Sequence, residues 1–140
     1  MDGYAFSTEV RVRFAETDAQ GVAHNAAYLV WYEVGRVEYL ARFGDGYRGI
    51  QAAGYEALTT ETHIRYVAPV RFDDRVRINV RCSDIRGARF RFEYLLECED
   101  RTVADGWTVH AVVDSETFRP ARFPTWLREA IEAVEPSAST

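Results

Sequence analysis

A stretch from residue 25 to about residue 43 constrains the fold more than any other part of the sequence. Asn25 is a favourable helix N-cap and Gly44 a favourable stop, so the stretch predicts one helix that is ~30 Å long at ~1.5 Å per residue. Apolar residues occur nearly all round it, namely Ala26, Ala27, Tyr28, Leu29, Val30, Trp31, Tyr32, Val34, Val37, Tyr39 and Leu40. A helix with almost no polar face is normally buried, so other segments must cover it.

Five segments show the alternation of apolar and polar residues that is typical of strands. One precedes the helix (4–14), and four follow a Gly-rich connection with one helical turn (44–54); these four are 58–67, 75–85, 88–99 and 102–118. Short breaks at 86–87 and 99–101 predict hairpins, and 124–134 predicts an amphipathic helix. The sequence therefore predicts an α+β fold in which a five-stranded antiparallel sheet curves around the long helix.

The length of the chain fits a single domain, which we expect over residues 1–135, followed by a flexible tail at 136–140. Five strands cannot enclose such a helix completely, so we expect a second copy of the chain to cover the remainder. No apolar run reaches the ~18 residues of a membrane span, and the N-terminus lacks the features of a signal peptide. These observations predict a cytoplasmic protein without a membrane partner.

Charge and cysteine content exclude several further classes. The net charge of −5 argues against general nucleic-acid binding, although residues 75–91 hold six arginines and one acid, Asp84, and could meet an anionic ligand. All 17 basic residues are arginine, which excludes lysine Schiff-base chemistry.

A turn at 86–87 would place Cys82 opposite Arg91 and Cys98 opposite Arg75, too far apart for a disulfide. The histidines and cysteines have no metal-ligand spacing, so we expect no metal.

Residues 13–28, RFAETDAQGVAHNAAY, are the most informative segment. The pattern resembles the signature of the 4-hydroxybenzoyl-CoA thioesterase family, in which a strand, an acid-containing Thr-Asp turn and a glycine precede a His-Asn or Asn-Asn pair that opens a long aromatic helix. Residues 64–74, IRYVAPVRFDD, resemble the second strand and exit turn of that family. The resemblance extends over roughly residues 8–130. It implies a hot-dog fold, hydrolysis of acyl-CoA thioesters without a cofactor, and assembly into a homodimer or homotetramer.

The resemblance also implies site residues. Asp18 would be the catalytic base or nucleophile, the backbone N–H of Asn25 would form the oxyanion hole, and His24 would orient a water or the substrate. The free N–H groups and dipole of a helix start suit a developing negative charge, and hydrolysis needs a carboxylate nearby. The alternatives are that Asp18 is only a turn residue, because Asp-x-x-Gly favours turns, and that His24 is an ordinary surface residue.

Other positions are candidates for binding the substrate. Gly21 and Tyr28 belong to the family pattern, and Arg86 and Arg89 lie at the hairpin where the nucleotide of coenzyme A is expected. Glu61 and His63 share one face of a strand and would assist only if that face lines the pocket.

The roles of two further polar residues, Glu33 and His110, are not determined by the sequence. Glu33 is the alternative carboxylate, because another hot-dog branch carries its acid on the central helix; otherwise it pairs with Arg36. His110 has no evident partner.

Rival functions remain open on sequence alone. They are a non-catalytic acyl-CoA-binding hot-dog protein, a hot-dog dehydratase or hydratase, an enediyne-type polyketide thioesterase, and a purely structural oligomer. Dehydratases and hydratases use a loop histidine with a helix acid in a motif that is missing here, and the enediyne-type enzymes carry Asn at the position of Asp18. The acyl group, and the choice between coenzyme A and a carrier protein, are undetermined.

Overall fold

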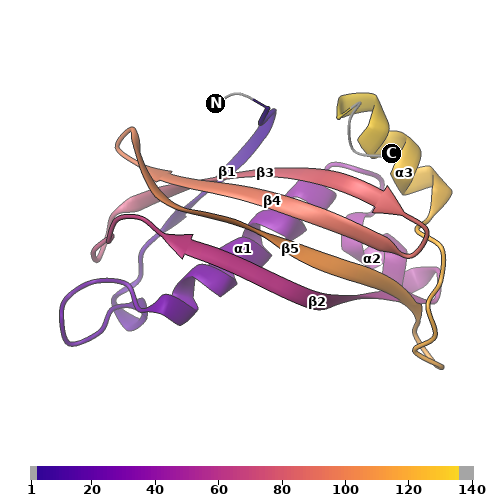
Figure 1. Ribbon diagram of the computed structural model, residues 1–140, viewed down its shortest axis with the longest axis horizontal. Helices are drawn as coiled ribbons and strands as arrows, with labels where there is room; N and C mark the ends of the chain where they lie inside the picture. The colour runs from indigo at the N-terminus through magenta and orange to yellow at the C-terminus, as the bar shows by residue number, and fades with distance from the viewer. Residues whose placement is uncertain (1–2, 136–140) are drawn as a thin grey trace.

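The computed structural model describes residues 3–135, so the predicted tail at 136–140 lies outside the described residues. The elements follow the chain as β1 (Phe6–Arg11), η1 (Phe14–Glu16), α1 (Asn25–Leu40), α2 (Gly46–Ala52), β2 (Tyr55–Tyr66), β3 (Arg75–Arg86), β4 (Arg89–Cys98), β5 (Arg101–Asp114) and α3 (Thr125–Val134). The strands form one antiparallel sheet in the order β1-β3-β4-β5-β2. Figure 1 shows α1 lying along one face of this sheet, as predicted.

Side-chain alternation along the strands produces the core. On β4, Phe92, Tyr94 and Leu96 are buried, and the residues between them are half-buried. Gly35 of α1 lies against β3, where a Cβ atom would come within 2.8 Å of Ile78 and 2.9 Å of Val80. Glycine is unfavourable in the middle of a helix, so its presence here is explained by the close packing of α1 on β3. The α+β hot-dog architecture is confirmed.

The ends of α1 differ from the prediction. His24, not Asn25, is the N-cap, with extended backbone angles of φ −75° and ψ 158°, and Asn25 is already helical. The helix ends at Leu40 instead of Phe43, because the chain tightens there and the N–H of Phe43 bonds to the carbonyl of Leu40 at 3.0 Å. The Gly-rich connection contains α2, a seven-residue helix.

The predicted register of the first hairpin is wrong by one residue. Cys82 lies opposite Phe92, and Ser83 lies opposite Arg91. The reason is a bulge between Ser83 and Arg86, where Asp84 adopts a φ of 55° and adds a residue to β3. Cys98 lies opposite Arg101 of β5 and not opposite a residue of β3. Both cysteines are free and buried.

A single chain leaves part of the apolar surface of α1 uncovered. Leu29, Val30 and Val37 are 43–46% exposed. Strand β2 is an edge of the sheet, and most of its residues from Leu58 to Tyr66 are exposed. None of the helices within residues 3–135 is long and apolar enough to cross a membrane.

Candidate active site

The loop that carries Asp18 is held at the start of α1 by a buried carboxylate. Glu16 is 5% exposed, and its Oε1 accepts the backbone N–H of Arg13 at 2.8 Å while its Oε2 accepts the indole N–H of Trp31 at 3.1 Å. The carbonyl of Glu16 also accepts the N–H of His24 at 2.9 Å, which closes the loop directly before the helix. Glu16 was not among the site residues predicted from the sequence, although its position two residues before Asp18 was a signal for it.

Asp18 occupies a tight turn within this loop. Its backbone N–H bonds to the carbonyl of Val22, and its carbonyl accepts the N–H of Gly21, both at 2.9 Å. Its Oδ1 accepts the N–H of Gln20 at 2.8 Å. Gly21 has a φ of 80°, a conformation that favours glycine. The predicted turn role of Asp18 is therefore present, and the exposed carboxylate still has an oxygen that no hydrogen bond within residues 3–135 occupies.

Aromatic residues surround the start of α1. The hydroxyl of Tyr66, at the end of β2, donates to the carbonyl of Asn25 at 3.1 Å. Tyr66 packs edge-on against Tyr28 at 5.0 Å, and Tyr28 packs against Trp31 at 4.8 Å. The N–H of Asn25, in the first helical turn, has no acceptor inside the helix. Asp18, Gly21, His24, Asn25 and Tyr28 thus lie at one end of the fold, although Tyr28 is 3% exposed and offers little surface to a ligand.

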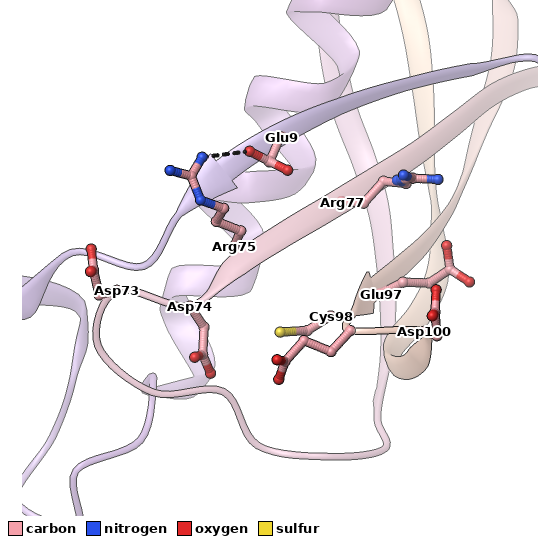
Figure 2. Close-up of a pocket in the computed structure, with 9 residues that line it drawn as sticks. Glu9, Asp73, Asp74, Arg75, Arg77, Glu97, Cys98 and Asp100 are labelled. Carbon is pink, nitrogen blue, oxygen red and sulfur yellow. Dashed lines mark hydrogen bonds and ion pairs between the residues drawn. The ribbon is translucent and has the colours of Figure 1, made fainter.

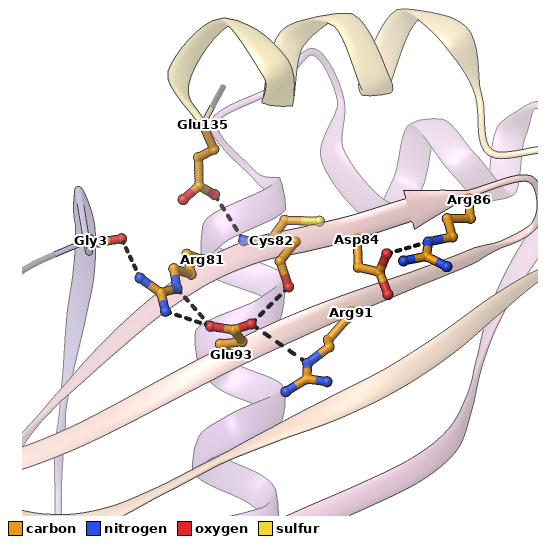
Figure 3. A network of polar contacts seen from close by, with 9 residues as sticks. Gly3, Arg81, Cys82, Asp84, Arg86, Arg91, Glu93 and Glu135 are labelled. Carbon is orange, nitrogen blue, oxygen red and sulfur yellow. Dashed lines mark hydrogen bonds and ion pairs between the residues drawn. The ribbon is translucent and has the colours of Figure 1, made fainter. Parts of the chain in front are cut away.

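Arginines gather at the opposite end of β3. Arg86, Arg122 and Arg128 line a hollow of about 330 Å³ with Thr125, the first residue of α3. Arg86 also pairs with Asp84 at 2.6 Å (Figure 3). Arg122 and Arg128 were not predicted from the sequence, because only a tertiary contact places their segment beside the hairpin. That contact is the hydrogen bond from the N–H of Phe123 to the carbonyl of Gly87.

Asp18 and Arg86 of the same chain lie far apart. The N–H of Ala23 bonds to the carbonyl of Val70 at 2.9 Å, so the Asp18 loop lies beside the start of β3, whereas Arg86 ends that strand. At ~3.3 Å per residue, the length of β3 separates them by roughly 35 Å. Figure 1 shows the loop before α1 and the β3–β4 turn at opposite ends of the molecule.

Three other predicted residues lie on the outer face of the sheet, away from α1. His63 stacks on Trp107 with ring centroids 4.2 Å apart, and Glu61 pairs loosely with Arg89 at 3.9 Å. Glu61 and His63 do share a face, as expected. That face is opposite the one on which the core packs, because their ladder partners alternate with the buried Thr108 and His110.

A cavity of about 310 Å³ lies between α1, α2 and the inner face of the sheet. Glu33 and Arg36 line it and pair at 3.9 Å, which confirms the contact predicted for them. His110 lines it too and is 3% exposed. Contrary to expectation, His110 has partners: its Nε2 lies 2.7 Å from the hydroxyl of Thr108 and its Nδ1 lies 3.2 Å from that of Thr59.

A separate hollow beside the start of β3 and the end of β4 is lined mainly by acidic residues. Figure 2 shows Asp73, Asp74, Glu97 and Asp100 around it, with Arg75 bonded to Glu9 at 3.1 Å. The carboxylates are not grouped as a metal site: residues 3–135 contain no cluster of three or more His, Cys, Asp or Glu side chains that could hold a metal ion.

Comparison with known proteins places this geometry in a family. Residues 12–131 match the thioesterase-like superfamily, so the chain belongs to that superfamily. The acyl-CoA thioesterase YbgC of Haemophilus influenzae is 29% identical over 131 residues, which cover 93% of this chain and 96% of the relative.

Solved structures agree with this assignment. The hypothetical protein TT1821 of Thermus thermophilus is 33% identical, with a TM-score of 0.85 over 91% of this chain and 97% of that one. A thioesterase of Thermus thermophilus, complexed with coenzyme A and Zn, is 27% identical, with a TM-score of 0.82 over 97% and 98% of the two chains.

Proposed function

We propose that the protein is an acyl-CoA thioesterase that hydrolyses a thioester to a free acid and coenzyme A. The observation that carries the proposal is the exposed carboxylate of Asp18 on a loop closed by hydrogen bonds against the start of α1, in a chain of the thioesterase-like superfamily. Relatives named as acyl-CoA thioesterases, and a structural neighbour complexed with coenzyme A, support the substrate class.

In this proposal Asp18 and Asn25 have separate roles in the reaction. Asp18 either removes a proton from a water that attacks the thioester carbon, or attacks that carbon itself to form an anhydride that water then hydrolyses to the free acid and Asp18. The N–H of Asn25 and the dipole of α1 stabilise the negative charge that develops on the carbonyl oxygen. The C–S bond then breaks, and the departing thiolate of coenzyme A takes up a proton. His24, at the N-cap, is a candidate for orienting the water or the substrate.

The proposed site is shared between two copies of the chain. The distance between Asp18 and Arg86 in one chain exceeds the reach of the pantetheine arm of coenzyme A. Strand β2 has a free edge, and a copy paired antiparallel along it would lie with its Tyr55 end beside the Tyr66 end of the first. Tyr66 touches Asn25, and the Tyr55 end lies on the hairpin side of the sheet. Antiparallel pairing therefore brings the arginines of one copy toward Asp18 of the other.

Arg86, with Arg122 and Arg128 beside it, then contacts the phosphates of coenzyme A. Guanidinium groups suit phosphates because they donate several hydrogen bonds in a fixed plane. Arg89 remains a candidate at the same hairpin, although its side chain lies beside Glu61 on the outer face.

Glu33 is the second candidate for the catalytic carboxylate. Its side chain is 66% exposed and lies at the cavity beside α1, where an acyl group could approach it. A non-catalytic acyl-CoA-binding protein would use the same surfaces without turnover.

The deciding experiment is a hydrolysis screen over short, long and aromatic acyl-CoAs with wild-type protein, Asp18→Asn and Glu33→Gln. Loss of turnover in Asp18→Asn alone supports the proposal. Loss in Glu33→Gln alone moves the role to Glu33, and binding without turnover in the wild-type protein indicates a non-catalytic binding protein.

A further inference from the structure

A chain of hydrogen bonds crosses the core and ends at the cavity beside α1. It begins at the guanidinium of Arg36, which bonds to the hydroxyl of Tyr94 at 3.3 Å. It continues to Thr108 at 2.7 Å, to Nε2 of His110 at 2.7 Å, and from Nδ1 of His110 to Thr59 at 3.2 Å. Four elements contribute: α1, β4, β5 and β2.

The direction of this chain follows from counting hydrogens. A guanidinium can only donate, so the oxygen of Tyr94 accepts from Arg36. Tyr94 is 1% exposed, and its single hydrogen must reach an acceptor. Within residues 3–135 the remaining neighbour of this hydroxyl is Thr108, so Tyr94 donates to Thr108. The opposite direction would leave the Tyr94 hydrogen buried without a partner, at a cost of ~1–3 kcal/mol.

The remaining bonds are then determined. Thr108 is 1% exposed and accepts from Tyr94, so the acceptor left for its own hydrogen within residues 3–135 is Nε2 of His110, and His110 carries its hydrogen on Nδ1. This hydrogen points to the oxygen of Thr59, whose own hydrogen is left over. Burial and the positive charge of Arg36 lower the pKa of His110 to about 3, which agrees with a neutral ring bearing one hydrogen.

The remaining hydrogen of the Thr59 hydroxyl lies at the cavity beside α1, whose lining is partly apolar. Thr59 is exposed at the cavity wall, beside a β-bulge between Thr59 and Glu61. Five of the lining side chains are apolar, namely Val37, Leu40, Ala57, Phe90 and Phe92, and Glu33, Arg36 and His110 line the cavity as well. Tyr47 also lines the cavity, but its hydroxyl donates to Glu56 at 2.8 Å and is therefore already used.

We propose that this cavity receives the acyl part of the substrate and that Thr59 donates a hydrogen bond to a neutral oxygen on it. The preferred substrates are then hydroxyacyl or oxoacyl thioesters and not plain hydrocarbon chains. This inference rests on the proposed function, because the antiparallel copy places the Ala57–Thr59 part of the cavity toward the helix start of its partner. The opposite charges of Glu33 and Arg36 at the same cavity offset each other, so the cavity as a whole does not attract an anionic group.

The first test needs no catalysis. Nitrogen-15 NMR of the histidine side chains reports which ring nitrogen carries the hydrogen. We expect His110 as the neutral Nδ1–H form, assigned with the His110→Asn variant. The Nε2–H form, or a charged ring at neutral pH, would reverse or interrupt this series of hydrogen bonds and would overturn the inference.

The second test uses matched substrates. Decanoyl-CoA is compared with the positional series of hydroxydecanoyl-CoA and oxodecanoyl-CoA isomers, with wild-type protein, Thr59→Val and the control Thr60→Val. Thr60 is the matched control because its hydroxyl bonds to the carbonyl of Val109 at 3.2 Å. We expect wild-type protein to prefer at least one oxygenated isomer in kcat/KM, and Thr59→Val to lose that preference by about three- to tenfold, the value of one neutral hydrogen bond.

Equal effects on plain and oxygenated substrates, or the same effect in Thr60→Val, would overturn the inference. If no acyl-CoA is hydrolysed, the proposed function fails, and the same pairs are compared by calorimetric binding. If wild-type protein binds an oxygenated isomer more tightly and Thr59→Val removes that preference, the cavity assignment is still supported. Equal binding of plain and oxygenated isomers would overturn it.

Discussion

Trp31 donates its indole N–H to Oε2 of Glu16 at 3.1 Å, which ties the second turn of α1 to the residue two positions before Asp18. Both side chains are buried. The position of the loop therefore depends on the packing of the helix, and this relationship gives a direct way to test what holds the candidate site in place.

Glu16→Gln should destabilise the protein by roughly 1–3 kcal/mol at neutral pH, because an amide NH2 would face donors that now bond to a carboxylate oxygen. Burial raises the pKa of Glu16, but hydrogen bonds from Arg13 and Trp31 outweigh it and hold the pKa below its ordinary value of 4.5. The carboxylate thus contributes stability above pH 4.5 that is lost as the pH falls further. Urea unfolding of both proteins from pH 3 to 7 measures this. The difference in their free energies of unfolding should become smaller below pH 4.5, and a difference that stays constant would contradict the prediction.

Asp18→Asn should lower kcat by roughly 10²–10⁴, the scale for removing a general base, while binding of acyl-CoA persists. The substitution keeps the shape of the turn, because the amide oxygen can still accept the N–H of Gln20. Steady-state kinetics on the best substrate, with a thermal melt to confirm folding, measures this. Asp73→Asn, in an exposed turn with an ion pair to Arg11, is the matched control and should retain turnover. Near wild-type kcat in Asp18→Asn would leave Asp18 as a turn residue.

Replacing His110 with Phe should change how stability depends on pH. The pKa of His110 is about 3 in the folded state and 6.5 ordinarily. Between these two pH values the unfolded chain binds a proton at His110 and the folded chain does not. Wild-type stability should therefore fall as the pH drops from 6.5 toward 3, and His110→Phe should lack that part of the slope. Denaturation midpoints are compared between pH 5 and 7, above the pH at which Glu16 is expected to take up a proton, so that the contribution of His110 is measured alone. Parallel curves for the two proteins would show that His110 titrates normally.

The protein should form a dimer or tetramer of its 16.0 kDa chain, through surfaces that include β2 and the exposed side of α1. Val30→Asp should weaken the assembly, because a charge would replace an apolar contact. Val134→Asp on α3 is the control, since both valines are 45% exposed in one chain. Size-exclusion chromatography with light scattering measures the mass. A wild-type monomer at micromolar concentration would contradict the shared site.

Arg86→Ala and Arg122→Ala should each raise KM for acyl-CoA several-fold, because an exposed contact with a phosphate contributes roughly 1 kcal/mol or less. The effect should shrink at high salt and be smaller for thioesters that lack the nucleotide. Arg89→Ala is measured in parallel to decide whether Arg89 belongs to the same site. Equal losses on both kinds of thioester would exclude the hairpin as the nucleotide site.

The sequence by itself determined the order of the elements and the type of fold. Alternation of apolar residues at a period of two, and the all-round apolar helix, are local patterns, so they could be read without coordinates. The motif around Asp18 and Asn25 was also local, since every member lies within residues 13–28.

Only the tertiary structure decided which residues meet. The bulge at Asp84 shifted the hairpin register, because a left-handed residue within a strand leaves little trace in the apolar pattern. Contacts between segments far apart in the chain joined Arg36, Tyr94, Thr108, His110 and Thr59, and brought Arg122 and Arg128 to Arg86. Such contacts depend on how α1 and the strands pack in three dimensions, and neither spacing nor periodicity along one chain records that.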